Sequence, residues 1–204
     1  MSFEKSFEHK QKLLDAALAE FVANGYEQAS INRILDKAGM SKGQFYYHFK
    51  NKEALYFALI ELSIQKKLDY FQNFNLLAGA PTDIFSLFKM QIRYGLIFAR
   101  EYPAIHDLSQ SFLRERGNSI YEKVMARHDF KDNEVIGQLI EMAHQKGEFR
   151  EDLPLPFIKQ MIGYLFNQAA DFANLDNMAE MESNLNYLID FMRSGLARGR
   201  EIGD

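Results

Sequence analysis

Residues 30–53 of the chain read SINRILDKAGMSKGQFYYHFKNKE. Apolar residues recur in this stretch every three or four positions, which is the spacing of helices that bury one face. Gly39 suits the left-handed residue that ends a first helix, and Ser41 suits the N-cap of a second. Phe45 and Phe49 would form the buried side of that second helix. The stretch therefore predicts two short helices joined by a tight turn, with one polar edge.

The polar edge has the chemistry of a helix-turn-helix that reads DNA. In that motif the first residues of the second helix enter the major groove, where Gln pairs with adenine and Lys reaches guanine or a phosphate. Gly43 has no side chain and lets the helix approach closely, and Lys52 would lie at a helix start whose free amides favour a phosphate. Hydroxyl and imidazole groups between them are donors to phosphates. We expect nine DNA contacts: Arg33, Ser41, Lys42, Gly43, Gln44, Tyr46, Tyr47, His48 and Lys52.

Each of these residues also has a simpler interpretation. An isolated Lys42 or His48 is more often solvated surface than a DNA contact, and Tyr46 fits half-buried packing as well as it fits a phosphate contact. Two helices around a glycine are also common in proteins. The combination of residue types at 41–53 is what favours DNA binding.

Outward from this stretch, the whole chain has a helical pattern. Apolar residues keep the three- and four-residue spacing, and alternating strand patterns are nearly absent. The sequence predicts an all-α fold, with a three-helix DNA-binding domain at residues 1–51 and a larger helical domain at 52–204. The other expected helices cover about residues 7–23, 52–74, 82–101, 104–115, 118–128, 132–147, 156–174 and 178–198.

The composition is that of an ordinary globular protein, with 204 residues of which 47% are hydrophobic and 25% charged. The absence of cysteine excludes disulfides, thiolate metal sites and cysteine nucleophiles. We expect a cytoplasmic protein, because no apolar run is long enough to span a bilayer and the first residues lack the apolar segment of a signal peptide. Residues 1–52 carry a net charge of +2 and the remainder carries −6, which fits a DNA-binding end on an acidic body.

Catalytic and metal chemistry have little support in the sequence. His106 and His128 each precede an aspartate, but their spacing matches no known ligand set, so we expect surface or capping histidines. There is no glycine-rich phosphate loop or nucleophile elbow, and no carboxylate pair is singled out. We therefore expect no catalytic residues, no metal and no cofactor.

The motif resembles the signature of the TetR/AcrR family of bacterial transcriptional regulators, which is close to S-x-G-x-[FL]-Y-x-H-F-x-x-K-x-x-L. Gln44 stands where a small residue is often found in that family, and Leu35 where alanine is common; the first difference bears on operator preference. The matching positions in this chain are Ser41, Gly43, Phe45, Tyr46, His48, Phe49, Lys52 and Leu55.

The resemblance implies a homodimer that binds double-stranded operator DNA and a small-molecule effector. The last two expected helices are rich in apolar residues and would pair with those of a second chain in a four-helix interface, although an intrachain core would produce the same pattern. An effector cavity would need apolar walls with a few polar groups. Its candidate residues are Phe98, Tyr102, Phe112, Tyr121, Met125, Tyr164, Asn167, Gln168 and Asp171.

The function that these expectations describe is a ligand-responsive transcriptional regulator, a repressor that binds a palindromic operator as a dimer. Two other functions remain open. One is an architectural or division-site protein that uses the same DNA-binding scaffold without an effector. The other is a small all-α enzyme in which the motif is coincidental.

Overall fold

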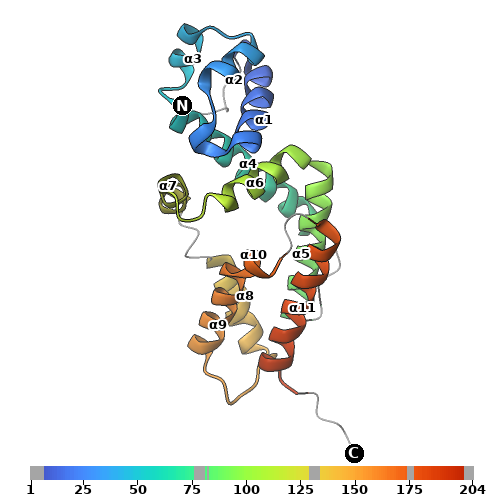
Figure 1. Ribbon diagram of the computed structural model, residues 1–204. Helices are drawn as coiled ribbons and strands as arrows, with labels where there is room; N and C mark the ends of the chain where they lie inside the picture. The colour runs from blue at the N-terminus through green and yellow to red at the C-terminus, as the bar shows by residue number, and fades with distance from the viewer. Residues whose placement is uncertain (1–6, 76–80, 82, 129–133, 174–176, 200–204) are drawn as a thin grey trace, which may run out of the picture. The chain divides into compact units, whose positions relative to one another are not determined.

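The computed structural model describes residues 7–75, 81, 83–128, 134–173 and 177–199. These residues form α-helices joined by short loops (Figure 1). Their extended pairing is limited to one isolated antiparallel bridge, between Phe149 and Ala197. The all-α fold with an N-terminal helix-turn-helix domain is therefore confirmed. Within the described residues, no helix is both long and apolar enough to cross a membrane.

The chain divides into two compact units, each of which has its own core. The head unit comprises Met1–Leu77 and Phe98–Asp129, and the body unit comprises Ala78–Ile97 and Phe130–Asp204. The helix α5 (Ile84–Glu101) begins in the body unit and ends in the head unit. The predicted functional boundary after residue 51 stays a prediction, because the compact units follow packing and not function.

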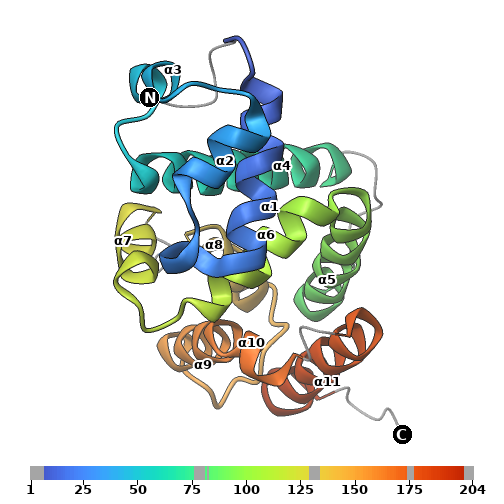
Figure 2. The same cartoon turned by 45° about the horizontal axis from the view of Figure 1, so that its top comes forward.

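The head unit buries large apolar side chains between its helices. In Figure 2, α4 (Lys52–Asn75) crosses behind α1 (Lys10–Gln28) and α2 (Ile31–Ala38). The core of the head unit includes Phe21, Phe45, Phe49 and Leu108, which are almost fully buried. The helices of this unit are α1 (Lys10–Gln28), α2 (Ile31–Ala38), α3 (Lys42–His48), α4 (Lys52–Asn75), α6 (Pro103–Arg114) and α7 (Ser119–His128).

The ends of the two short helices follow the sequence signals. Ser30 caps α2 by accepting a hydrogen bond from the Arg33 amide, at 3.4 Å. Gly39 ends α2 in the left-handed conformation at φ 63°, which glycine adopts without a Cβ clash. The buried Met40 then donates its amide to the Leu35 carbonyl, at 3.0 Å. These local signals place α3, the second helix of the expected helix-turn-helix, at the predicted residues.

The first helix differs from the prediction of about residues 7–23. It runs from Lys10 to Gln28, with non-helical angles at Gly25 of φ 65° and ψ 177°. The glycine thus bends the helix where the sequence predicted its end, and a short helical stretch follows the bend. The prediction missed that stretch because its hydrogen-bond partners lie far away in the sequence, in α4 and beside α6.

The body unit packs α5 (Ile84–Glu101), α8 (Glu134–Gln145), α9 (Leu155–Asn167), α10 (Ala169–Phe172) and α11 (Met178–Leu196) around a second core. The helix expected at about 156–174 is divided at Gln168, whose φ of −96° and ψ of 2° end α9. The expected helix starts at residues 82 and 132 lie outside the described residues, as does the expected helix end at 174.

Candidate nucleic-acid interface

The recognition helix α3 begins with a reciprocal capping box. The Ser41 hydroxyl accepts a hydrogen bond from the Gln44 amide at 3.2 Å, and Gln44 Oε1 accepts from the Ser41 amide at 2.9 Å. Gln44 Oε1 also accepts from the Ser41 hydroxyl, at 2.9 Å. The two lone pairs of that oxygen are thus used within the chain, while Nε2 has no partner among the described residues. A bidentate pair with adenine would therefore require Gln44 to leave the capping box.

The two sides of α3 differ sharply in exposure. Phe45 is fully buried, and Phe49 just after the helix is nearly so. Tyr46 and Tyr47 are exposed, and 74% of the Tyr47 surface remains accessible. Lys42 is exposed as well, with no hydrogen bond or ion pair to the described part of the chain. The buried Phe45 and Phe49 therefore fix the helix so that its polar first turn and its tyrosines face outward.

Gly43 occupies a position at which the chain itself has no need of glycine. It lies in a regular helix, and a Cβ added there would meet only the Ser41 hydroxyl, at 4.0 Å. Glycine costs helix stability relative to alanine. An outside surface that approaches the backbone closely would account for its presence.

His48 is half-buried because its ring stacks on Phe7. The ring centroids lie 4.0 Å apart and the ring planes meet at 21°. The segment before α1 thus packs beside the end of α3. His48 has the donor that the sequence predicted for a phosphate, but this stacking fixes the plane of its ring.

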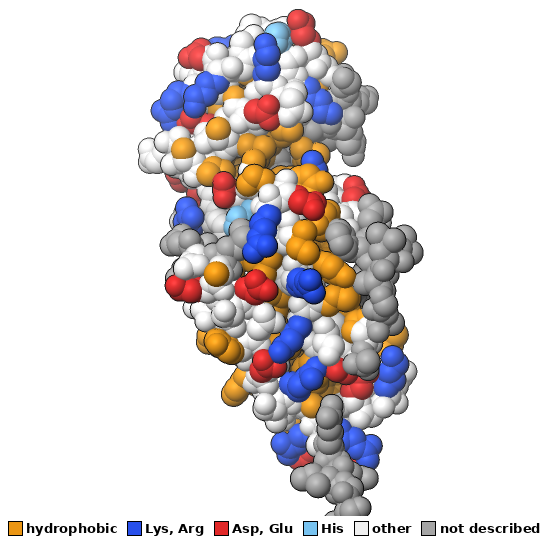
Figure 3. All heavy atoms as spheres, turned by 90° about the vertical axis from the view of Figure 1, so that its right-hand side faces the viewer, with side chains coloured by type: hydrophobic (Ala, Val, Ile, Leu, Met, Phe, Trp, Pro, Cys, Tyr) orange, Lys and Arg blue, Asp and Glu red, His pale blue; other side chains and the backbone are white. Residues whose placement is uncertain are grey.

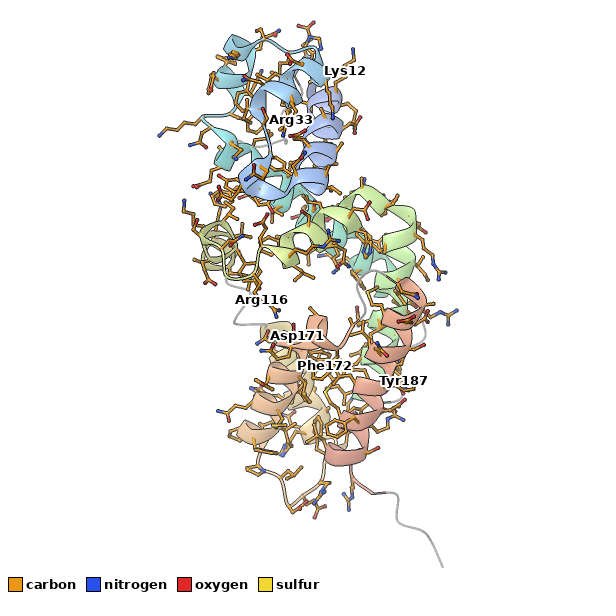
Figure 4. The ribbon with its side chains drawn as sticks, in the orientation of Figure 1. Lys12, Arg33, Arg116, Asp171, Phe172 and Tyr187 are labelled. Atoms are coloured by element: carbon orange, nitrogen blue, oxygen red, sulfur yellow. The ribbon has the colours of Figure 1, made fainter. Side chains whose placement is uncertain are left out.

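Arg33 is engaged within the head unit and does not extend freely. Its Nη2 lies 2.5 Å from Glu20 Oε1, and its Nε lies 2.8 Å from the same oxygen. Nη2 also donates to the Gln28 carbonyl, at 2.9 Å. Only 2% of Glu20 is accessible, and its bond to Arg33 is the largest influence holding the pKa of this carboxyl below its usual value of 4.5. The pair joins α1 to α2 in the position marked for Arg33 in Figure 4.

Lys52 is held more completely than Arg33. Its ammonium donates to the carbonyls of Tyr26 at 2.8 Å, Glu27 at 2.9 Å and Ala29 at 3.2 Å. The same group lies 4.7 Å from the centre of the Tyr26 ring. All three ammonium protons are thus directed at the free carbonyls that end α1.

The structure therefore divides the nine predicted DNA contacts into two sets. The outward set is exposed around the first turn of α3 and its tyrosines: Ser41, Lys42, Gly43, Gln44, Tyr46 and Tyr47. The inward set forms contacts within the head unit: Arg33, His48 and Lys52. A DNA contact by any residue of either set stays a prediction.

Sequence reasoning missed the acidic partners that hold this region. Glu20 lies on the buried side of α1 between Ala16 and Phe21, and a carboxylate in that position was the available signal. Glu115 accepts a bond from the Tyr26 amide 89 residues earlier, at 2.7 Å, and no local pattern marks such a contact. Lys12 of α1 is a further exposed cation; it lies at the same upper end of the head unit as α3 in Figure 4.

The predicted effector residues are distributed over both units. In the head unit, Phe98 lies 4.9 Å from Tyr102, and Phe112 stacks on Tyr121 with centroids 4.8 Å apart. Met125 also belongs to this unit, whereas four candidates belong to the body unit: Tyr164, Asn167, Gln168 and Asp171. The effector cavity stays a prediction.

The helices α9 and α11 each have a buried and an exposed apolar side. Ile158 and Ile189 are almost fully buried in the body unit. In contrast, 69% of Tyr187 and 67% of Phe191 remain accessible, and Tyr164 is exposed on α9. The predicted apolar richness of these helices thus serves both an intrachain core and an uncovered surface.

Comparison with known proteins gives a consistent set of similarities. Residues 13–59 match the sequence model of bacterial regulatory proteins of the tetR family. The fatty acid metabolism regulator protein of Bacillus subtilis is 23% identical over 192 residues, which cover 91% of this chain and 94% of the relative. The probable acrEF/envCD operon repressor of Escherichia coli K12 is 25% identical over 166 residues, covering 78% and 72%.

Solved structures have the same fold over nearly the whole chain. A TetR family transcriptional regulator from Chloroflexus aurantiacus aligns with a TM-score of 0.67 and 24% identity, covering 97% of both chains. The regulator FadR from Bacillus subtilis, solved in complex with stearoyl-CoA, aligns with a TM-score of 0.67 and 17% identity. That alignment covers 91% of this chain and 98% of FadR.

Proposed function

This chain belongs to the tetR family of bacterial regulatory proteins and is a DNA-binding transcriptional regulator, and from that premise we propose that it is a dimeric repressor released from a palindromic operator by a small effector. The proposal includes a cytoplasmic location, where bacterial DNA lies, and regulation without catalysis. The relatives bear the names of regulators and of an operon repressor, which supports this assignment.

The observation that carries the proposal is the outward side of α3. Lys42, Gly43 and Tyr47 are exposed on a helix that Phe45 anchors, and the chain itself does not require the glycine. A helix of this kind fits the major groove, where its first turn reaches base edges and its hydroxyl groups reach phosphates. Lys42 would then contact guanine or a phosphate, and Gln44 would read a base through its unpaired Nε2.

Dimerisation is proposed through α9 and α11. Exposed aromatic side chains on both helices, among them Tyr164, Tyr187 and Phe191, leave an apolar surface that a second copy would cover. Figure 3, which looks onto the side of the molecule where α11 lies in Figure 1, shows hydrophobic side chains at the surface between charged ones. Two copies joined in this way would carry two recognition helices for the two half-sites of a palindrome.

The effector is proposed to bind among the aromatic helices of the larger helical domain. FadR was solved with stearoyl-CoA, so a protein of this fold accommodates a small molecule. The effector would act by binding more tightly to the form that fits DNA poorly, which shifts the population away from the operator. The candidate residues are the nine that the sequence singled out.

The proposal is tested by selecting duplexes from random DNA with the full-length protein and mapping its sites on its own chromosome. We expect a palindromic consensus, a few chromosomal sites beside operons, and an affinity that falls steeply with salt because phosphate contacts release counterions. Failure to select any sequence at low salt would refute DNA reading. Many dispersed sites without a consensus would instead favour the architectural alternative.

Gly43→Ala tests the groove contact directly. Alanine should raise the free energy of unfolding by about 0.5 kcal/mol, because it is the better helix former and has room within the chain. The same change should weaken binding to the selected duplex at least tenfold, because the added methyl group keeps the helix away from the bases. A Gly43→Ala variant that is more stable and binds the duplex equally well would show that α3 does not approach the bases closely. Gly137→Ala on α8, where an added Cβ also meets open space, is the matched control.

A further inference from the structure

A buried carboxylate from outside the helix-turn-helix holds the bend of α1. Glu115 follows the last residue of α6, and 8% of it is accessible. Its Oε1 accepts a hydrogen bond from the Tyr26 amide at 2.7 Å, and its Oε2 accepts from Asn118 Nδ2 at 2.6 Å. Both oxygens of this carboxylate are therefore used within the head unit.

The Tyr26 residue is held from two directions. Its amide donates to the Glu115 carboxylate, and its carbonyl accepts from the Lys52 ammonium at 2.8 Å. Its ring lies 5.0 Å from the ring of the buried Tyr56. An anion, a cation and an aromatic ring thus fix the residue that directly follows the bend.

Gly25, the residue before Tyr26, leaves the space that the contact between Glu115 and the Tyr26 amide requires. A Cβ added to Gly25 would lie 2.7 Å from Glu115 Oε1, and the positive φ of 65° disfavours any other residue. A second bond from α6 lies one turn earlier, where the Ser111 hydroxyl donates to the Phe21 carbonyl at 3.1 Å. Side chains at the end of α6 therefore bind directly to backbone groups near the end of α1.

We propose that Glu115 is a positioning residue for DNA binding. By fixing the Tyr26 amide it sets the direction in which the chain leaves α1, and hence the orientation of α2 and α3 on the head unit. Without the carboxylate, the Tyr26 amide would lose this acceptor, and the contacts of Lys52 and Tyr56 would remain to restrain the residue after the bend. This role lies outside the DNA-binding motif, in the range 52–204 that the sequence assigned to the larger helical domain.

The proposal is tested in the full-length protein with Glu115→Ala and Glu115→Gln. Glutamine keeps an oxygen for the Tyr26 amide, and the exposed Asn118 is able to turn its own oxygen toward the new amide. Glu122→Ala removes the same charge from an exposed position on α7 and is the matched control. Amide hydrogen exchange reports the bend, and titration with the selected duplex reports binding.

We expect Glu115→Ala to raise the exchange rate of the Tyr26 amide and of α2 at least tenfold, while α9 and α11 keep their protection. Affinity for the selected duplex should fall about tenfold, which is roughly 1.4 kcal/mol. Glu115→Gln should restore both readouts to within about threefold of the original protein, and Glu122→Ala should change neither. This pattern separates positioning from a general loss of stability, which would raise exchange in both units.

Two results would overturn the proposal. One is unchanged exchange at Tyr26 in Glu115→Ala, and the other is an equal loss in Glu115→Gln, which would make charge and not the acceptor the cause. If Glu115→Ala does not fold, Glu115→Asp is the replacement, because it keeps the charge but is one methylene too short to reach Tyr26. The proposal rests on the DNA binding proposed above, and the exchange readout needs no DNA, so the two fail separately.

Discussion

The outward edge of α3, residues 41–47, which we call the reading edge, and the end of α1 both involve charged or polar side chains, but in opposite states. At the reading edge, Lys42 and Tyr47 are exposed and Lys42 forms no bond to the described part of the chain. At the end of α1, Lys52 of α4 and Glu115 after α6 direct their charged atoms at backbone groups of Tyr26. A polar residue in a DNA-binding motif therefore has two distinct uses: to contact DNA, or to hold the helices that do.

The comparison matters most for Lys52. The sequence predicts a phosphate contact, and the structure shows an ammonium surrounded by three carbonyls. If the structural use dominates, loss of this side chain weakens DNA binding by unfolding the turn. If the phosphate contact dominates, binding weakens while the fold is unaffected.

Lys52→Met should have the largest effect on stability. Methionine keeps the apolar stem but leaves the three carbonyls without the ammonium, and hydrogen bonds to charged groups contribute about 1.5–3 kcal/mol each. We expect the free energy of unfolding to fall by about 3 kcal/mol, measured by urea denaturation. Lys42→Met is the control at the reading edge and should change it by less than about 0.5 kcal/mol. A stable Lys52→Met that no longer binds DNA would restore the phosphate role.

Glu20→Gln should have the next largest effect, with a dependence on pH. The pKa of Glu20 is lowered in the folded state, mainly by its bond to Arg33, so its charge stabilises the fold at pH values above its usual 4.5. At pH 7 we expect a loss of about 2 kcal/mol in the free energy of unfolding. The difference between the two proteins should shrink as the pH falls below 4.5 through the lowered pKa. A difference that stays constant down to pH 3 would contradict the charge-based explanation.

Gln44 combines the two uses, because its side chain caps α3 and also faces outward. Gln44→Ala should cost about 1 kcal/mol of stability through the lost cap, and it should also change the preferred base in selected duplexes. Gln44→Glu separates these uses, since its carboxylate keeps the capping box but has no Nε2 donor. We expect Gln44→Glu to keep its stability and lose the base preference that the Nε2 donor provides. Unaltered base preference in both variants, measured by selection from random DNA, would refute the reading role.

Tyr47→Phe should have the smallest effect and the cleanest interpretation. The ring is exposed, so stability should stay within about 0.5 kcal/mol of the original. Loss of one hydroxyl donor to a phosphate should weaken binding about threefold for all sequences alike. Titrations with the selected duplex and a scrambled one measure both effects. A loss confined to the selected duplex would indicate base contact instead.

Local signals in the sequence determined most of the reading edge. Ser30 and Ser41 cap their helices, Gly39 ends α2, and the buried Phe45 and Phe49 were identified from helical spacing. These features depend on residues at most four positions apart, so the sequence by itself contains the information. The helical fold class follows from the same spacing, and the motif at residues 41–55 carries the resemblance to the family.

The tertiary structure alone decided which polar groups are used inside the molecule. Lys52 meets carbonyls 23 to 26 residues earlier, and Glu115 meets an amide 89 residues earlier. No local spacing encodes such pairs, because the chain brings them together only when α1, α4 and α6 pack on one core. The sequence thus determined the recognition helix and its exposed edge, whereas packing decided which charged residues remain available for DNA.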